Sequence, residues 1–303
     1  MTTINIEHTS RWFGNVVAVN DVTMSIGPGV TGLLGPNGAG KSTLINMMAG
    51  FLAPSTGTVT LDGEKIWRNE SVYRQIGIVP EREGMYDFLT GLEFVVANAE
   101  LHGLGAKAAR AALATVEMEY AQDRRIGTYS KGMRQRVKMA SALVHDPSVL
   151  LLDEPFNGMD PRQRMQLMEL LRRMGATGRT VLFSSHILEE VEQLASHIEV
   201  IVAGRHAASG DFRKIRRLMT DRPHRYLVRS SDDRALAAAL IADPSTAGIE
   251  VDLAEGALRI QAVDFGRFTE LLPKVAREHS IRLLTVSPSD ESLESVFSYL
   301  VAA

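Results

Sequence analysis

One glycine-rich stretch of the chain has the composition and spacing of a loop that binds phosphate. The pattern G-x-x-x-x-G-K-[ST] is filled by Gly35, Pro36, Asn37, Gly38, Ala39, Gly40, Lys41 and Ser42, and Thr43 follows as a further expected nucleotide contact. Glycines here let the backbone turn its N–H groups inward around phosphate oxygens, at a helix N-terminus whose dipole favours the same charge. Lys41 is then expected to reach the β- and γ-phosphates, and the Ser42 hydroxyl to ligate Mg²⁺. The alternative is a chance glycine-rich turn, which the strand before the loop and the helix after it disfavour.

An acidic pair ends an apolar strand further along the chain. Residues 149–152 are all apolar, and Asp153 and Glu154 follow them directly. In enzymes with this kind of phosphate loop, an acid at a strand end holds Mg²⁺, and here that acid is Asp153. Glu154 is then the candidate that polarises the attacking water. The alternative is a strand that merely meets a polar turn, but the pair occurs together with the phosphate loop, which favours the catalytic interpretation.

The elements that must position these residues follow an alternating pattern. Short apolar runs at residues 30–34, 148–153 and 180–184 predict strands of a sheet that is covered on both faces. A helix is predicted from Lys41, and further helical stretches separate the strands. This alternation predicts an α/β layer architecture for a first domain that spans residues 1–219.

A third pattern separates the possible classes of nucleotide-binding protein. Residues 128–136 precede a helix whose apolar face carries Val137, Ala140 and Val144, and this helix leads into the acidic strand. On this run the sequence resembles the ATP-binding subunits of ABC transporters, whose LSGGQ-type signature matches residues 129–133. The resemblance covers most of the first domain. It implies the fold of an ABC cassette, in which a mixed sheet core of the P-loop NTPase type carries a helical subdomain.

The resemblance also implies roles for three further positions. Phe13 matches the aromatic residue that stacks on adenine, with Trp12 as the second candidate. Asp160 closes a Gly-Met-Asp run that matches the D-loop of the family and is counted among the nucleotide contacts. His186 follows an apolar strand and matches the switch histidine, which would contact the γ-phosphate and orient Glu154 and the attacking water.

The signature run has a physical meaning that does not depend on the family name. Ser130 supplies a hydroxyl and Gly132 exposes a backbone N–H, both beside a helix N-terminus, so with Lys131 between them they form a second anion-binding tip. A plain helix N-cap at Ser130 is the alternative. The resemblance implies that the tip binds the γ-phosphate of ATP held by the opposite subunit, so that a homodimer shares two ATP sites. Hydrolysis would remove that contact and let the dimer open.

Two residues depart from the family pattern. Met133 stands where the signature often has Gln, and a Met side chain cannot donate a hydrogen bond. Glu81 stands where most relatives have a Gln that contacts Mg²⁺ and the attacking water and couples to the membrane subunit. A carboxylate can still ligate Mg²⁺, so the expected metal ligands are Ser42, Asp153 and Glu81. ATP and Mg²⁺ are therefore the expected cofactors.

The composition excludes several other classes of protein. The 303 residues include no cysteine, which excludes a disulfide scaffold, a thiolate metal site and a cysteine nucleophile. The net charge of −3 gives no general reason to bind nucleic acid, and we expect none as a partner. The eight histidines show no H-E-x-x-H spacing, so we expect no protein-bound transition metal. The Arg-rich run at residues 213–217 is interpreted as a solvated helix face.

No stretch of the sequence has the character of a membrane span or a secretory signal. The longest wholly apolar run, residues 235–242, is far shorter than the roughly 20 residues that a helix needs to cross a bilayer. The first five residues lack the basic and apolar stretches of a signal peptide. We therefore expect a cytoplasmic protein that lies on the inner face of the cell membrane through a separate transmembrane permease subunit.

A smaller pattern begins after a polar, proline-bearing linker at residues 220–224. Strands are predicted at residues 225–229, 249–253, 258–263 and 281–286, and helices at residues 232–241, 265–279 and 292–301. The order β-α-β-β-α-β is that of a ferredoxin-like unit, so residues 224–303 are predicted to form a small α+β accessory domain. It shows no catalytic or metal constellation, so a dimerisation or stability role is favoured over a ligand sensor.

These patterns together predict an ATP-binding and ATP-hydrolysing subunit of an ABC transporter. The resemblance to export-type subfamilies implies export, whereas no residue specifies the substrate. The alternative is a soluble ABC-type ATPase that acts on ribosomes or DNA. Proteins of that kind carry two cassettes in one chain or insert a long coiled coil between loop and signature. Residues 41–130 show no sustained heptads and no basic run, which disfavours this alternative.

Overall fold

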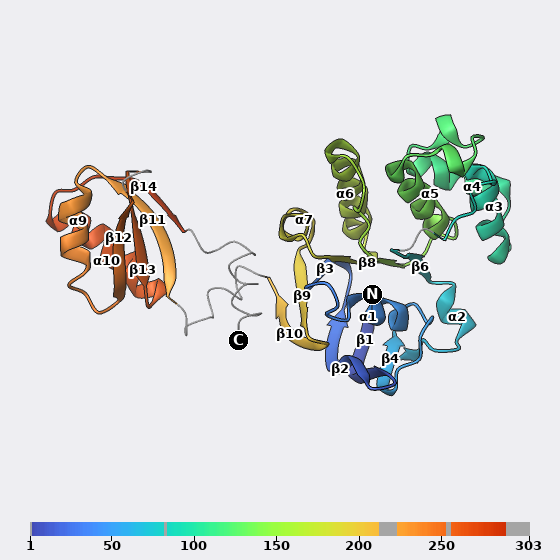
Figure 1. The fold of residues 1–303 in the computed structure, drawn as a ribbon, viewed down its shortest axis with the longest axis horizontal. Helices are drawn as coiled ribbons and strands as arrows, with labels where there is room; N and C mark the ends of the chain where they lie inside the picture. The colour runs from blue at the N-terminus through green and yellow to red at the C-terminus, as the bar shows by residue number, and fades with distance from the viewer. Residues whose placement is uncertain (1, 82–83, 212–222, 253–255, 289–303) are drawn as a thin grey trace. The chain divides into compact units, whose positions relative to one another are not determined.

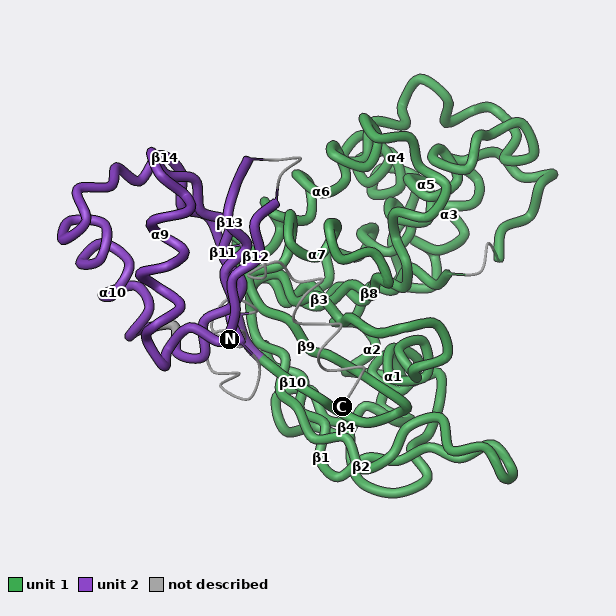
Figure 2. The backbone as a smooth tube through the Cα atoms, turned by 60° about the vertical axis from the view of Figure 1, so that its left-hand side comes forward, with its two compact units in different colours: residues 1–209 green, residues 210–303 purple. Residues whose placement is uncertain are grey.

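The chain folds into two compact units, residues 1–209 and residues 210–303 (Figure 2). The structure, a computed structural model, describes residues 2–81, 84–211, 223–252 and 256–288 (Figure 1). The predicted linker at residues 220–224 and the end of the predicted first domain lie mostly outside the described residues. Within the described parts of the chain, no helix combines the length and the apolar character needed to cross a membrane.

A six-stranded sheet forms the centre of unit 1. Its strands in spatial order are β10 (Arg205–Gly210), β9 (His197–Val202), β3 (Gly29–Leu34), β8 (Thr180–Ser185), β7 (Val149–Leu152) and β6 (Ile76–Val79). The pairs β3–β9, β3–β8, β8–β7 and β7–β6 are all parallel. Apolar side chains fill these strands because both faces of the sheet are covered. The carboxyl ends of the parallel strands meet at one edge, which brings together the segments that follow them.

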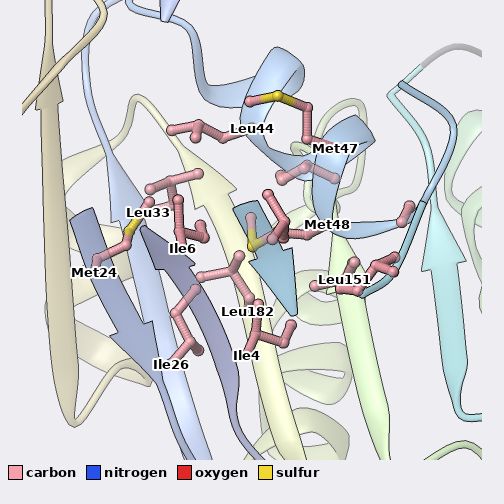
Figure 3. Packing of buried hydrophobic residues seen from close by; sticks show 14 of the residues in the cluster. Ile4, Ile6, Met24, Ile26, Leu33, Leu44, Met47, Met48, Leu151 and Leu182 are labelled. Carbon is pink, nitrogen blue, oxygen red and sulfur yellow. The ribbon is translucent and has the colours of Figure 1, made fainter. Parts of the chain in front are cut away.

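A second, antiparallel sheet lies in the same unit and makes the sheet core mixed, as predicted. Its strands in order are β2 (Val16–Ile26), β1 (Ile4–Phe13), β4 (Thr56–Leu61) and β5 (Glu64–Lys65). Helix α1 (Lys41–Met48) buries Leu44, Met47 and Met48 among residues of both sheets (Figure 3). The phosphate loop therefore leads into a helix that is fixed by packing on two sides.

The predicted helical subdomain is present in unit 1. Helices α3 (Gly91–Leu101), α4 (Ala106–Thr115) and α5 (Lys131–Leu143) pack on one another. Thr90 begins α3 with a reciprocal capping box with Glu93, which satisfies two backbone donors. Helices α6 (Pro161–Ala176) and α7 (Leu188–Leu194) cover the six-stranded sheet on the face opposite α1 (Figure 1). A short helix α2 (Glu70–Tyr73) precedes β6.

Unit 2 has the predicted ferredoxin-like order of elements over its described residues. These are β11 (His224–Ser230), α9 (Asp233–Leu240), β12 (Thr246–Asp252), β13 (Ala257–Ala262), α10 (Phe265–Glu278) and β14 (Leu283–Pro288). The sheet order is β12-β13-β11-β14, and every neighbouring pair is antiparallel. Leu236 and Leu240 both lie in the core, as the helical spacing predicts. The predicted helix at residues 292–301 lies outside the described residues.

The last strand of unit 2 begins later than predicted. The sequence predicts an extended segment from residue 281, whereas β14 begins at Leu283. The helix closes through a turn in which Ser280 has a φ of 57° and the N–H of Ile281 donates to the carbonyl of Ala276. Ile281 is nevertheless buried in the core. Its apolar character therefore reflects burial in the turn rather than membership of the strand.

Candidate functional site

The phosphate loop lies between β3 and α1, at the carboxyl edge of the parallel sheet. Gly40 caps the helix with a φ of 104°, and a Cβ there would collide with the carbonyl oxygen of Ala18. Only glycine tolerates both conditions, because other residues strain at positive φ and carry a Cβ. The first N–H groups of α1, from Lys41 onward, have no carbonyl acceptor within the helix. They are available to an anion held by the loop.

Lys41 is the buried cation of this loop. Its ammonium donates to the carbonyls of Gly35 at 2.7 Å and Pro36 at 3.2 Å, and it lies 3.7 Å from Oε1 of Glu154. Burial lowers the pKa of Lys41, and the nearby carboxylates of Glu154 and Asp153 oppose that change. The ammonium is thus held inside the loop, next to the acidic strand end.

A cavity of about 490 Å³ opens in front of the loop. It is lined by Ala18, Asn37, Gly38, Gly40, Lys41, Ser42, Thr43, Glu81, Glu154, Asn157 and His186. The cavity therefore brings together most of the residues predicted from the loop, the acidic strand and the switch position. The sequence interpretation missed Ala18 and Asn157, which no motif marks. Gly35, Pro36 and Ala39 belong to the loop but do not line the cavity.

The acidic strand end is held by a hydroxyl from the neighbouring strand. Ser184 of β8 donates to Oδ1 of Asp153 at 2.6 Å and accepts from the backbone N–H of Glu154 at 2.8 Å. Glu154 itself has a φ of 48°, an uncommon conformation for a residue with a side chain. Asp153 and Glu154 are both buried. Ser184 was missed from sequence because it acts only through the parallel pairing of β7 with β8.

His186 and Glu154 form a close pair at the cavity wall. Nδ1 of His186 lies 3.0 Å from Oε1 and 2.9 Å from Oε2 of Glu154. The Glu154 side chain is 9% exposed and that of His186 is 39% exposed. The imidazole therefore reaches solvent, whereas the carboxylate beneath it is buried. The Lys41 ammonium lies 3.7 Å from Oε1 of the same carboxylate. A carboxylate held in this way can accept a proton from a water in the cavity.

A second buried carboxylate, missed from sequence, stands behind this pair. Glu190 of α7 accepts a hydrogen bond from the Ser185 hydroxyl at 2.6 Å and lies 3.3 Å from the guanidinium of Arg164. Burial raises the pKa of Glu190, and the hydrogen bond and the arginine oppose that rise. Ser185 is the residue before His186. Glu190 therefore helps to fix the strand end that carries the histidine.

The predicted second anion-binding tip does not line the main cavity, although Lys131 lines a smaller cavity that shares Glu81 and Glu154 with it. Ser130 is the N-cap of α5 and accepts from the N–H of Met133 at 3.3 Å, so the plain N-cap that was the alternative is observed. A Cβ at Gly132 would collide with the side chain of Gln163. The backbone N–H of Gln163 in turn donates at 3.0 Å to the side chain of Asp160, the N-cap of α6. The signature run and the D-loop run are thus adjacent. Ser130, Lys131, Gly132 and Asp160 do not line the main cavity.

The two aromatic candidates for adenine stacking are exposed at the end of β1. Phe13 is 48% exposed and Trp12 is 43% exposed, and neither lines the cavity. The guanidinium of Arg11 lies 4.7 Å from the centre of the Phe13 ring, so a cation already occupies one face of that ring. An aromatic contact to a base at Phe13 stays a prediction.

The predicted metal ligands are one hydroxyl and two carboxylates. Ser42 and Glu81 line the cavity, whereas Asp153 lies behind its wall. Over the described ranges, no group of three or more His, Cys, Asp or Glu side chains could hold a metal ion. The oxygen donors of Ser42, Asp153 and Glu81 fit Mg²⁺, which keeps several waters and takes substrate phosphates as ligands. These residues therefore fit a metal ion that arrives with a nucleotide.

Comparisons with known proteins agree with this geometry. The family described as ABC transporter matches residues 19–157. The Nod factor export ATP-binding protein I of Burkholderia orbicola (strain AU 1054) is 37% identical over 213 residues, which cover 68% of this chain and 70% of that protein. The linearmycin resistance ATP-binding protein LnrL of Bacillus subtilis (strain 168) is 32% identical over 302 residues, which cover 97% and 96%. The second match extends over both compact units.

Solved structures show the same fold. The structure of an ATP-binding subunit of an ABC transporter has a TM-score of 0.65 and 29% sequence identity, and the match covers 71% of this chain and 92% of that one. A nucleotide-free ATP-binding cassette from an ABC transporter has a TM-score of 0.64 and 25% identity, with coverage of 70% and 92%. The matched part of this chain, 71% and 70% of its residues, is about as long as unit 1.

Proposed function

The chain belongs to the ABC transporter family as an ATP-binding and ATP-hydrolysing subunit, and we propose that it powers export through a separate membrane-spanning partner. Export is supported by the names of relatives, which concern export of Nod factor and resistance to linearmycin. None of these relatives favours the alternative of an ATPase that acts on ribosomes or DNA. The location at the inner face of the membrane follows from the partner and is part of the same proposal.

The observation that carries the catalytic proposal is the arrangement of Lys41, Glu154 and His186 around one cavity. Glu154 lies within 3.7 Å of the lysine ammonium and within 3.0 Å of the imidazole. In the proposed reaction, Glu154 accepts the proton of the attacking water, and His186 holds the carboxylate and contacts the γ-phosphate. Lys41 and the N–H groups at the start of α1 hold the β- and γ-phosphates.

The proposed metal ligands are Ser42, Asp153 and Glu81. Bound Mg²⁺ would neutralise charge that develops on the phosphate oxygens. The contribution of the chain is to hold the oxygen donors of Ser42 and Glu81 at the cavity wall and the buried Asp153 carboxylate next to Glu154. Ser184 fixes the Asp153 carboxylate through the 2.6 Å hydrogen bond, so this ligand is oriented before any metal binds.

The proposed assembly is a homodimer in which Ser130, Lys131 and Gly132 of one subunit contact the ATP of the other. The position of this tip supports the proposal, because it lies outside the main cavity of its own subunit. Met133 contributes its backbone N–H to the Ser130 cap, so the lack of a side-chain donor there does not leave the cap unmade. Residues 224–303 are proposed as an accessory domain for dimerisation or stability.

Substitution of Glu154 tests the catalytic assignment. In the full chain, Glu154→Gln is expected to bind ATP within about threefold of the wild type and to lower the turnover number by about 10²–10⁴-fold, the usual contribution of a general base. Turnover is measured as phosphate release, and binding is measured by titration calorimetry. Wild-type turnover in this variant would show that Glu154 does not activate the water.

Copurification of a membrane protein with the chain in mild detergent tests the proposed partner.

A further inference from the structure

One buried cation of unit 1 has no place in the reaction described above. Among the lysines that the structure describes, Lys41 and Lys138 are buried, each with a relative exposure of 6%. Lys138 lies in the middle of α5, two turns after Lys131. Its ammonium donates to the carbonyl of Pro80 at 3.1 Å and to that of Glu81 at 3.3 Å. This side chain therefore joins the signature helix to the segment that carries Glu81.

The Pro80–Glu81 corner offers carbonyl acceptors to this buried ammonium. Strand β6 ends at Val79, so the carbonyls that follow leave the regular ladder of the sheet. Pro80 and Glu81 are exposed residues, whereas Lys138 is buried, and a buried ammonium without acceptors would cost several kcal/mol. The two carbonyls supply acceptors to that ammonium. The contact therefore ties the Pro80–Glu81 corner to α5 through a buried charge.

The opposite side of the corner is joined to the catalytic strand end. The N–H of Asp153 donates to the carbonyl of Val79 at 2.9 Å, which continues the pairing of β6 with β7. Glu81 lines the main cavity with Glu154, and both also line a smaller cavity of about 190 Å³, together with Lys138. The corner is therefore held between α5 and the residues proposed to hydrolyse ATP.

We propose that Lys138 is a positioning residue for hydrolysis, which acts by holding the Pro80–Glu81 corner so that the Glu81 carboxylate stands at the edge of the nucleotide cavity. The proposal rests on the proposed function, because Glu81 is there a ligand of the metal. Helix α5 would then have two roles. Its N-cap, Ser130, is the proposed contact to the ATP of the opposite subunit, and Lys138 connects the same helix to the Glu81 corner of its own site.

Two substitutions at Lys138 separate positioning from general stability. Lys138→Met keeps the unbranched stem but removes the charge and the donors, and we expect the turnover number to fall about tenfold or more while the ATP dissociation constant changes less than about threefold. Lys138→Arg restores charge and donors and is expected to recover most of the turnover. The matched control is Lys107→Met on the exposed face of α4, which should leave turnover unchanged. If Lys138 served packing alone, its substitution would not lower the turnover number selectively while leaving the ATP dissociation constant almost unchanged.

A double-mutant cycle with Glu81 tests the route of action. Glu81→Ala is expected to lower turnover by itself, and adding Lys138→Met should lower it less than about twofold further, because the positioned group is already gone. If Lys138→Met shows no cooperative unfolding transition, the cycle is run with Lys138→Gln, for which we expect a smaller loss of about threefold. Full turnover in folded Lys138→Met or Lys138→Gln protein would overturn the proposal. It would also be overturned if the losses of turnover caused by the Glu81 and Lys138 substitutions multiplied in the double mutant. The proposed function fails separately, if the wild type in the same assay binds ATP but does not hydrolyse it.

Discussion

The two units of this chain treat buried charge in opposite ways. Unit 1 buries two lysines and several carboxylates, namely Lys41, Lys138, Asp153, Glu154, Glu190 and Glu199. Among the described residues of unit 2, no Lys, Arg, Asp or Glu is buried, and the buried polar side chains are those of His224, Ser245 and Thr246. The apolar cores of both units are otherwise built in the same way, with strands and helices that contribute alternating or periodic side chains.

The difference indicates where chemistry is done. A buried charge costs several kcal/mol unless it is paired and hydrogen-bonded, and its arrangement seldom adds stability beyond what apolar residues would give. In unit 1, Lys41 and Glu154 line the main cavity and Lys138 lines the smaller cavity beside it, whereas Glu199 pairs with His206 on β10. The described part of unit 2 has no buried charges of this kind. Substitutions of the charges at the cavity of unit 1 should therefore lower activity, whereas substitutions in the core of unit 2 should lower its stability.

The largest effect is expected at the lysine of the phosphate loop. Lys41→Ala removes the buried ammonium that is proposed to hold the β- and γ-phosphates, and ATP binding should weaken by about 10²-fold or more. Fluorescent-nucleotide titration measures the affinity, and Lys107→Ala serves as the control for loss of a lysine. Wild-type affinity for ATP in a folded Lys41→Ala protein would show that this lysine does not hold the phosphates.

The next effect belongs to unit 2 and should be confined to stability. Phe268 is fully buried in α10 and packs on Tyr226 with ring centres 4.7 Å apart. Phe268→Ala is expected to destabilise unit 2 by about 3–5 kcal/mol, because it leaves a cavity in the core. Thermal unfolding followed by circular dichroism measures the loss. The turnover number per folded chain should stay at the wild-type value, and a matching fall in turnover would contradict the division of tasks between the units.

The smallest effect concerns a buried carboxylate of unit 1 that is remote from the phosphate loop in sequence. Glu199 of β9 lies 2.6 Å from Nε2 of His206 on β10, and this hydrogen bond raises the pKa of His206 against the opposing effect of burial. A raised folded-state pKa adds stability below the unfolded value, about 6.5, and that stability is lost as the pH rises through the folded-state pKa. The loss of melting temperature in His206→Gln should therefore be larger at about pH 6 than at about pH 9. An equal loss at both values would contradict the charged pair.

Local patterns made most of the site predictable from sequence. The loop at residues 35–42 and the acidic pair at Asp153 and Glu154 are short motifs, and the parallel sheet brings them to one edge as its topology requires. His186 was placed from the resemblance and does contact Glu154. Ser184, Glu190 and Lys138 were not predicted, because each acts through a partner about 30 residues or more away or on another element, and no spacing in the sequence records such a contact.

The same contrast explains where the fold prediction was inexact. The ferredoxin-like order of unit 2 follows from periodicity along the chain, and the described residues have it. Periodicity did not predict where β14 begins. Ile281 is apolar because it is buried in a turn, and it does not belong to the strand. Periodicity reports which side chains face the core, whereas the point at which an element begins depends on a backbone turn.

In the proposed mechanism, Glu154 activates the water that hydrolyses ATP held between two copies of the chain. The most direct measurement is the molar mass of the full-length Glu154→Gln variant by light scattering, with Mg²⁺ and either ATP or ADP. We expect the mass to double with ATP and not with ADP, because the γ-phosphate is the contact shared by both subunits and this variant does not remove it. A monomeric mass with ATP bound, or turnover at the wild-type rate, would contradict the proposed mechanism.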